Sequence, residues 1–234
     1  VESNVISNCT ADQSSIMSLL STGTNVVFEN NTIDSCQGKY ALMFNTDYTL
    51  NPQIKQFRRS VVQYFTGTTV IYINANDWQI TDNEFKQNYV TNLVESGGSF
   101  AETSLPYNYW GEDLFESIRV AILDAMKTPS LSFIDFSPYK TQSGELMVEE
   151  NEFIINSTME WTAPKYLSGT VFIRKSHKLS ITADVALGSQ VNILCNGRLE
   201  IVGENDKQNS KKKTAAVFPK IFIEARELLH MLQN

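Results

Sequence analysis

A short alternation of apolar and polar positions recurs along the chain. It reads apolar, x, apolar, x, x, Asn, x, apolar, x, x, and then Cys or Asn. Its copies are Val26, Phe28, Asn31, Ile33 and Cys36; Trp78, Ile80, Asn83, Phe85 and Asn88; Leu146, Val148, Asn151, Phe153 and Asn156; and a truncated Val1, Asn4, Ile6 and Cys9. Alternation with period two on either side of a fixed Asn is typical of two short strands joined by a tight turn. Equivalent positions of successive copies would then stack, so the pattern predicts a solenoid.

The Asn residues of this pattern are regularly spaced. Asn4 and Asn31 lie 27 residues apart and Asn31 and Asn83 lie 52 apart, which leaves room for a degenerate copy at residues 54–65. Stacked side-chain amides can hydrogen-bond to one another along such a column. The predicted ladder consists of Asn4, Asn31, Asn83 and Asn151. The alternative explanation is that Asn occurs here because it tolerates the left-handed backbone of a turn.

One segment has helical rather than strand periodicity. Leu114, Ile118, Ile122 and Met126 recur every four residues, which predicts an amphipathic helix over residues 112–126. Acidic residues begin this segment, and a lysine and a proline follow it, as the helix dipole and the geometry of proline favour. Strand-like runs separated by glycines then resume at residues 171–173, 179–181, 191–194 and 199–202.

We therefore expect an all-β chain in three parts. Residues 1–160 would hold the stacked strands with the inserted helix 112–126, and residues 161–205 would begin a second run. Residues 206–234 would form a basic loop around residues 211–213, a strand at 217–223 and a short C-terminal helix at 224–232. A hydrophobic content of 42% in 234 residues is ample for a core.

Charge and hydropathy exclude several classes of partner. The net charge of −7 and the pI near 4.9 argue against nucleic acids and anionic membrane surfaces, both of which favour a basic patch. No apolar run approaches the roughly 18 residues that span a bilayer, so we expect no membrane insertion. The three cysteines lack the spacing of metal ligands, and no nucleotide-binding motif is present. We expect neither a metal nor a cofactor.

Two cysteines occupy the same position of consecutive copies of the pattern. Stacking would bring the Cα atoms of Cys9 and Cys36 to about 4.8 Å, a distance that permits a disulfide. Two stacked, buried thiols are the alternative, since a disulfide needs an oxidising compartment. Glycosylation sequons occur at Asn8, Asn30 and Asn156. The first two fall at turn or outward positions, whereas Asn156 falls in an inward position of the pattern and would be hard to glycosylate if buried.

The block Asn108, Tyr109, Trp110 and Gly111 is followed by the predicted helix and by the run Phe-Ile-Asp-Phe-Ser-Pro-Tyr at residues 133–139. This arrangement resembles a motif of secreted right-handed parallel β-helix proteins, which share the pectin-lyase-like fold. Residues 168–203 are similar to the segment that opens a new run of coils in such proteins. The resemblance implies a right-handed parallel β-helix. Tyr109 and Trp110 would anchor the helix on the coils or, alternatively, stack on a ligand.

Catalysis has few candidates in this sequence. His177 and His230 are the only histidines, and neither has a recognisable partner for a catalytic triad. The resemblance to pectate lyases and related polysaccharide enzymes implies a groove with carboxylates, calcium and a basic residue. The candidates for these roles are Asp77, Asp82, Arg58 and Arg59. None of them lies in a family motif, so we assign no catalytic residue.

The expected function is that of a non-catalytic structural or adhesive module in an extracellular or secreted surface assembly. Its partners would be protein neighbours at the ends of the strand stack, including further copies of the chain, because unpaired strand edges must be capped or continued. A module of this kind would belong to a filament or an adhesin, and we expect it to be a glycoprotein. The alternative is a β-helix protein that binds glycans or cleaves polysaccharides as a lyase or hydrolase.

Overall fold

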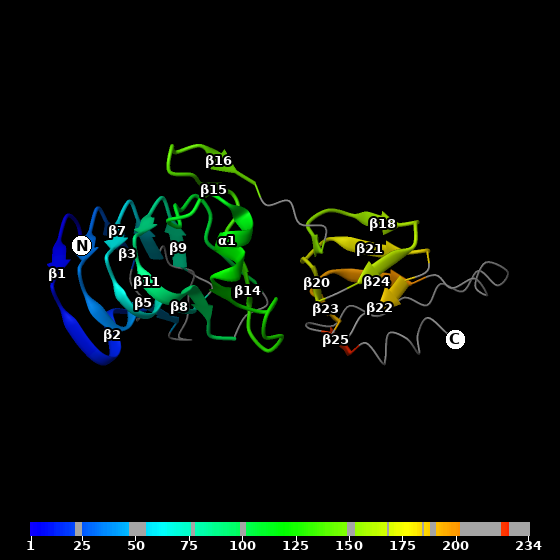
Figure 1. The fold of residues 1–234 in the computed structure, drawn as a ribbon, viewed down its shortest axis with the longest axis horizontal. Helices are drawn as coiled ribbons and strands as arrows, with labels where there is room; N and C mark the ends of the chain where they lie inside the picture. The colour runs from blue at the N-terminus through cyan, green and yellow to red at the C-terminus, as the bar shows by residue number, and fades with distance from the viewer. Residues whose placement is uncertain are drawn as a thin grey trace. The chain divides into compact units, whose positions relative to one another are not determined.

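A computed structural model describes residues 1–21, 25–46, 55–75, 78–98, 102–148, 153–167, 169–183, 185–187, 191–201 and 221–224. The chain divides into two compact units, Val1–Glu149 and Glu150–Asn234, so the expected boundary at residue 160 falls inside the second unit. Both units consist mainly of β-strands, most of them paired in parallel (Figure 1). The prediction of an all-β chain with parallel sheets is therefore confirmed.

Three parallel sheets build most of the first unit. The four-stranded sheet contains β1 (Val5–Ser7), β4 (Thr32–Asp34), β7 (Val61–Gln63) and β10 (Glu84–Lys86). The five-stranded sheet contains β2 (Thr10–Ser21), β5 (Gln37–Thr46), β8 (Thr66–Asn74), β11 (Tyr89–Ser96) and β13 (Ile122–Leu123). The three-stranded sheet contains β3 (Val26–Glu29), β6 (Lys55–Arg58) and β9 (Trp78–Thr81).

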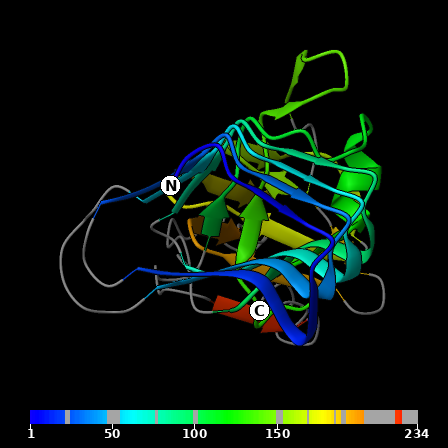
Figure 2. The same ribbon diagram turned by 90° about the vertical axis from the view of Figure 1, so that its left-hand side faces the viewer.

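Consecutive strands from β1 to β11 go to different sheets. The triplet β3, β4 and β5 contributes one strand to each sheet, and the triplets β6 to β8 and β9 to β11 do the same. Figure 2 shows the blue, cyan and green strands of successive triplets nested behind one another. The degenerate copy predicted within residues 54–65 is thus the start of the middle triplet, although residue 54 lies outside the described residues.

Apolar residues at equal offsets form columns in the core. In the four-stranded sheet Ile6, Ile33, Val62 and Phe85 are in register, and the last three are buried. The three-stranded sheet aligns Phe28, Phe57 and Ile80, and the five-stranded sheet aligns Met17, Leu42, Ile71, Val94 and Ile122. The alternation of apolar and polar residues along each strand therefore matches the strand period of two, because one set of side chains enters the core and the other faces outward.

The predicted helix is shorter than its apolar pattern suggested. Helix α1 comprises only Phe115–Val120, and the chain then enters β13, which pairs in parallel with β11. Residues 112–126 are therefore wrong as helix bounds. Ile122, expected on the helix face, is buried as the last member of a sheet column. Backbone pairing with the edge of β11 satisfies this segment and overrides its helical periodicity.

The remainder of the first unit differs from the triplets. Strand β12 (Glu102–Ser104) pairs in parallel with β14 (Phe133–Asp135), and β15 (Tyr139–Lys140) forms an antiparallel pair with β16 (Leu146–Met147). The sequence copy that begins at Leu146 therefore does not continue the stack. Leu146 and Val148 are exposed, and Asn151 lies outside the described residues.

The second unit has its own core. Its sheets contain β17 (Ile154–Ile155), β20 (Thr170–Ile173), β23 (Asn192–Cys195) and β25 (Ile221–Glu224); β18 (Met159–Trp161), β21 (Lys178–Ile181) and β24 (Arg198–Ile201); and β19 (Lys165–Leu167) and β22 (Val185–Leu187). All pairs are parallel except that of β23 with β25. The predicted basic loop and the predicted C-terminal helix from residue 225 onward lie outside the described residues.

Candidate functional site

Two columns of left-handed residues mark the corners on either side of the four-stranded sheet. The first-corner column consists of Ser3, Asn30, Arg59, Asp82 and Tyr107, with φ between 51° and 63°. The second-corner column consists of Asn8, Ser35, Tyr64 and Gln87, with φ between 52° and 54°. Asn and Asp tolerate this conformation, whereas other non-glycine residues seldom adopt it unless the surrounding structure enforces it. Here each corner residue turns the chain from one sheet into the next.

The residues that follow the first corner form a hydrogen-bonded ladder. The backbone N–H of Asn4 donates to Oδ1 of Asn31 at 3.1 Å, and the N–H of Asn31 donates to Oγ of Ser60 at 3.1 Å. The N–H of Ser60 donates to Oδ1 of Asn83 at 3.0 Å, and the N–H of Asn83 donates to Oδ1 of Asn108 at 2.9 Å. The ladder thus satisfies amides that the left-handed corners turn into the core.

The side-chain amide groups complete this ladder. Nδ2 of Asn83 donates to the carbonyl of Phe57 and to Oδ1 of Asn108, both at 3.0 Å, and Nδ2 of Asn108 donates to the carbonyl of Ile80 at 2.8 Å. The left-handed conformation belongs to the residue before each ladder member, so a turn preference does not explain the Asn positions. Sequence reasoning missed Ser60 and Asn108 as members. Ser60 was recognisable because the polar position of the degenerate copy falls on it.

The block Asn108 to Gly111 closes the ladder. Trp110 is buried, and its ring stacks on Phe85 with centroids 4.9 Å apart and an interplanar angle of 21°. Gly111 has φ +84°, and a Cβ atom there would lie 2.8 Å from the carbonyl oxygen of Phe85. Only glycine fits this close approach without strain. Trp110 is therefore an anchor in the core, whereas Tyr109 is partly exposed.

Asn8, Asn30, Cys9 and Cys36 lie at or next to these corners, whereas Asn156 follows β17 in the second unit. Asn8, Asn30 and Asn156 are all exposed. Asn156 therefore does not occupy the inward position that the sequence pattern predicted for it. The cysteines that follow the second corner are free thiols, Cys9 exposed and Cys36 buried. The backbone N–H of Cys9 donates to Sγ of Cys36 at 3.4 Å. Burial raises the pKa of the Cys36 thiol, although the hydrogen bond from the Cys9 N–H opposes this shift.

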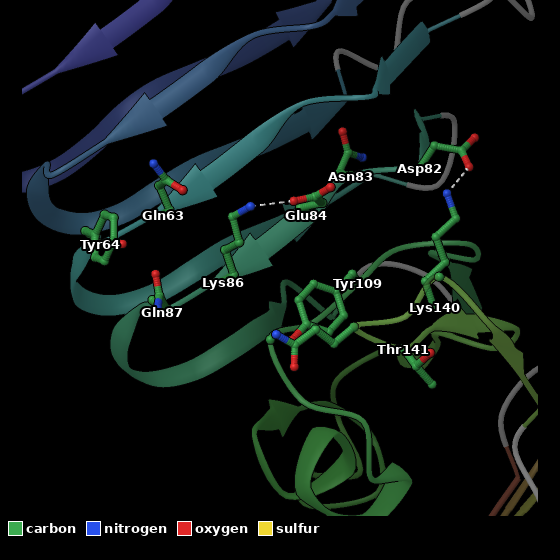
Figure 3. Close-up of a pocket in the computed structure, with 13 residues that line it drawn as sticks. Gln63, Tyr64, Asp82, Asn83, Glu84, Lys86, Gln87, Tyr109, Lys140 and Thr141 are labelled. Carbon is green, nitrogen blue, oxygen red and sulfur yellow. Dashed lines mark hydrogen bonds and ion pairs between the residues drawn. The ribbon is translucent and has the colours of Figure 1, made fainter.

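A polar pocket lies beside the four-stranded sheet (Figure 3). Its cavity volume is about 490 Å³, and the segment around β15 forms one of its walls. The lining residues come from β7, β10, the corners, the block after residue 108 and the turn after β15: Gln63, Tyr64, Asp82, Asn83, Glu84, Lys86, Gln87, Tyr109, Gly111, Lys140, Thr141, Gln142 and Gly144. Amides, hydroxyls and two tyrosines dominate this lining.

The charges of the pocket are paired. Lys140 Nζ lies 2.7 Å from Asp82 Oδ1, and Lys86 Nζ lies 2.7 Å from Glu84 Oε2. Figure 3 shows these two ion pairs, with Tyr64 and Gln87 together at the opposite end from Lys140. Burial, assisted by nearby acidic residues, raises the pKa of Tyr109. Its phenol can donate a hydrogen bond at neutral pH, as any tyrosine can.

The residues considered for catalysis do not converge. Asp82 is in the pocket, but Arg58 and Arg59 both contact Glu29, at 2.8 and 2.6 Å. Asp77 lies outside the described residues. Among the described residues no group of three or more His, Cys, Asp or Glu side chains is arranged as metal ligands. No helix in the described part of the chain is long and apolar enough to cross a membrane.

The pocket could not be predicted from local motifs. Lys140 and Asp82 are 58 residues apart in the sequence, and only the stacking of β15 beside the triplets brings them together. His177 lies in a turn of the second unit, where its backbone carbonyl accepts the N–H of Arg198 at 2.9 Å; His230 lies outside the described residues.

Comparisons of the chain with protein-family models, with curated proteins and with solved structures gave no match.

Proposed function

We propose that residues 1–149 form a right-handed parallel β-helix and that the chain is a non-catalytic structural or adhesive module of an extracellular or secreted surface assembly. The observation that carries this proposal is the ladder from Asn4 to Asn108, which hydrogen-bonds five successive levels of the stack. The ladder is buried from Asn31 to Asn108, and a buried, hydrogen-bonded polar column rigidifies its surroundings and specifies one register. Right-handed winding is the rule for connections between parallel strands.

Unpaired strand edges support an assembling role. Strands β1 and β2 each lie at one edge of their sheet, and no other described strand pairs with those edges. The outer edge of β3 already bonds residues 1–3 of this chain, through Ser3 N–H to the Glu29 carbonyl and Glu29 N–H to the Val1 carbonyl. Open edges offer rows of backbone donors and acceptors to a neighbouring chain. In the second unit, β25 covers the edge at β23 by antiparallel pairing. A protein neighbour, such as a second copy of this chain, would cover the open edges of the first unit in the same manner.

Electron microscopy and analytical ultracentrifugation test this role. We expect association that increases with protein concentration, and end-to-end particles in negative stain. Replacing Val5, which is exposed on β1, with Pro would remove an edge donor and weaken the association. The matched control is Val148→Pro, at a valine of similar exposure that lies outside any strand or helix. A protein that stays monomeric and unattached at every concentration would contradict the proposal.

The paired state of the pocket carboxylates supports a non-catalytic role. A carboxylate that acts as acid, base or calcium ligand needs access to the substrate or ion, whereas Asp82 and Glu84 are each engaged by a lysine. We expect no cleavage of acidic polysaccharides in the presence of calcium, measured as new reducing ends or unsaturated products. Cleavage that Asp82→Ala abolishes and the control Glu116→Ala preserves would overturn the non-catalytic assignment.

Glycan binding is the second candidate, because the pocket combines tyrosine rings with uncharged polar groups. Tyr64 and Tyr109 can stack on the apolar faces of sugar rings, while Gln63 and Gln87 can bond hydroxyl groups. A glycan array followed by calorimetry tests this. We expect Tyr64→Asn, which tolerates the left-handed corner, to weaken binding at least several-fold, and the exposed Tyr89→Asn outside the pocket to leave it unchanged.

A further inference from the structure

Cys9 and Cys36 occupy neighbouring levels of the stack in matching positions. Ser7 pairs with Asp34 before them, and Thr10 pairs with Gln37 after them, so the two cysteines are directly opposite. Strands in such pairing are about 4.8 Å apart, within the range of Cα separations that a disulfide bridges. The contact of the Cys9 N–H with Cys36 Sγ at 3.4 Å places the second sulfur beside the first residue.

We propose that Cys9 and Cys36 are a cross-linking site that forms a disulfide under oxidising conditions and fastens the outermost strands to the next level of the stack. The proposal depends only on the observed pairing of β1 with β4 and of β2 with β5. It does not require the assembling or glycan-binding roles, so its failure would leave them standing.

The environments of the two thiols set the order of the reaction. Cys9 is exposed, whereas Cys36 is buried and its pKa is raised, so Cys9 is the thiol that meets an oxidant in solution. With oxidised glutathione, the Cys9 thiolate attacks one sulfur and releases one glutathione thiolate, which takes up the proton lost by Cys9. Cys36 then loses its proton and attacks the Cys9 sulfur. The second glutathione leaves as its thiol, and one disulfide replaces the two protein thiols.

The cross-link would act where the stack is least protected. The first nine residues are exposed except for the half-buried Ile6. Strand β1 has three residues and pairs on one side only. A disulfide here closes the loop between residues 9 and 36 and restricts the unfolded chain. By the loop-entropy relation and the usual heat of unfolding, the Tm should rise by about 6–12 °C.

The test is equilibration of the full, folded chain with a glutathione redox buffer, followed by intact mass and non-reducing peptide mapping. We expect the mass to fall by two hydrogen atoms, the peptides containing Cys9 and Cys36 to be linked, and Cys195 to remain a free thiol. The rise in Tm should disappear on reduction. Cys195→Ser, at the buried cysteine of the second unit, is the matched control and should still form the link.

Cys9→Ser changes an exposed residue, so this variant should fold and should show no redox-dependent Tm. Three free thiols after equilibration would overturn the proposal. So would a stable glutathione adduct on Cys9, or a link to Cys195, because each shows that the two thiols of the stack do not reach one another in the folded chain.

Discussion

At the residue scale, the ladder shows how buried amides are satisfied at a corner. Each left-handed corner turns a backbone N–H away from any strand partner, and the side chain of the next level accepts it. Ser60 fills one level with a hydroxyl that accepts from Asn31 and donates to the carbonyl of Arg58 at 3.0 Å. The ladder therefore selects short polar side chains with an oxygen acceptor, and not Asn alone.

Replacing Asn83 with Ala should destabilise the first unit strongly. The change leaves the Ser60 N–H and the Phe57 carbonyl without their partners in the core and opens a small cavity. We expect a loss of about 2–4 kcal/mol in the free energy of unfolding, measured with chemical denaturant. Asn83→Ser, which imitates Ser60, should cost less. Asn4→Ala at the exposed end of the ladder should cost under about 1 kcal/mol, and equal effects at both ends would contradict the ladder.

Two glycines with the same backbone conformation separate strain from steric clash. Gly111 and Gly144 both have φ +84°, but a Cβ atom at Gly144 would meet nothing within 4 Å. Gly144→Ala should cost about 1–2 kcal/mol through its left-handed backbone alone. Gly111→Ala should cost about 1–3 kcal/mol more, because its Cβ would approach the Phe85 carbonyl to 2.8 Å. Equal Tm values for the two variants would show that the close approach of residue 111 to the Phe85 carbonyl adds no steric cost.

At the element scale, α1 is fastened to the strands that follow it by one buried ion pair. Arg119 Nη1 lies 2.8 Å from Asp124 Oδ2, and its guanidinium lies over the rings of Phe133 and Phe136. Asp124 also accepts the N–H groups of Met126 and Ile134. A carboxylate with these donors holds the turn that follows β13 and joins it to β14.

Asp124→Asn should therefore disturb this junction. The amide cannot balance the Arg119 charge, and it presents a donor where an acceptor is needed. We expect a loss of about 3–5 kcal/mol in unfolding free energy. Glu116→Gln, an exposed change within α1, is the control and should alter stability by less than about 0.5 kcal/mol. Faster amide exchange confined to residues 115–135 would locate the effect.

A second junction between elements gives a pH dependence. Glu29 on β3 bonds Arg58 on β6, and this contact lowers the pKa of the carboxyl below its usual 4.5. The folded carboxylate binds a proton less readily than the unfolded one, so its stabilisation is present above pH 4.5 and is lost as the pH falls through the lowered value. Glu29→Gln should flatten the fall in Tm on acidification. If the dependence of Tm on acidic pH is the same in this variant, the Glu29–Arg58 pair does not stabilise the fold.

Particular elements show what could be predicted. Alternation around Asn31 and Asn83 gave the parallel stack, because period two and a fixed polar residue reflect backbone geometry that each copy repeats. The same periodic reasoning failed at Ile122, where a sheet edge far along the sequence competed with the helix. It failed again at Leu146, whose antiparallel partner lies in a short hairpin. The pocket depends on contacts between residues that are distant in the sequence, so no local pattern predicted it.

At the scale of the whole molecule, the two units have separate cores. The first contains Ile71 and the second contains Ile193, both fully buried. We expect two transitions in scanning calorimetry, since each compact unit folds cooperatively. Ile71→Ala should lower the Tm of one transition by several degrees, and Ile193→Ala should lower the other. A single transition that both variants shift equally would mean that the units unfold as one.

The corner columns also predict which changes of length this gene can accept. The two corners of each of the first four levels are five positions apart, as from Asn30 to Ser35 and from Asp82 to Gln87. The separations between successive ladder residues vary, at 27, 29, 23 and 25. Insertions and deletions are therefore absorbed outside the corner-to-corner segment. A single codon added between two corners would reverse the inward and outward faces of that strand, whereas several codons added elsewhere would not.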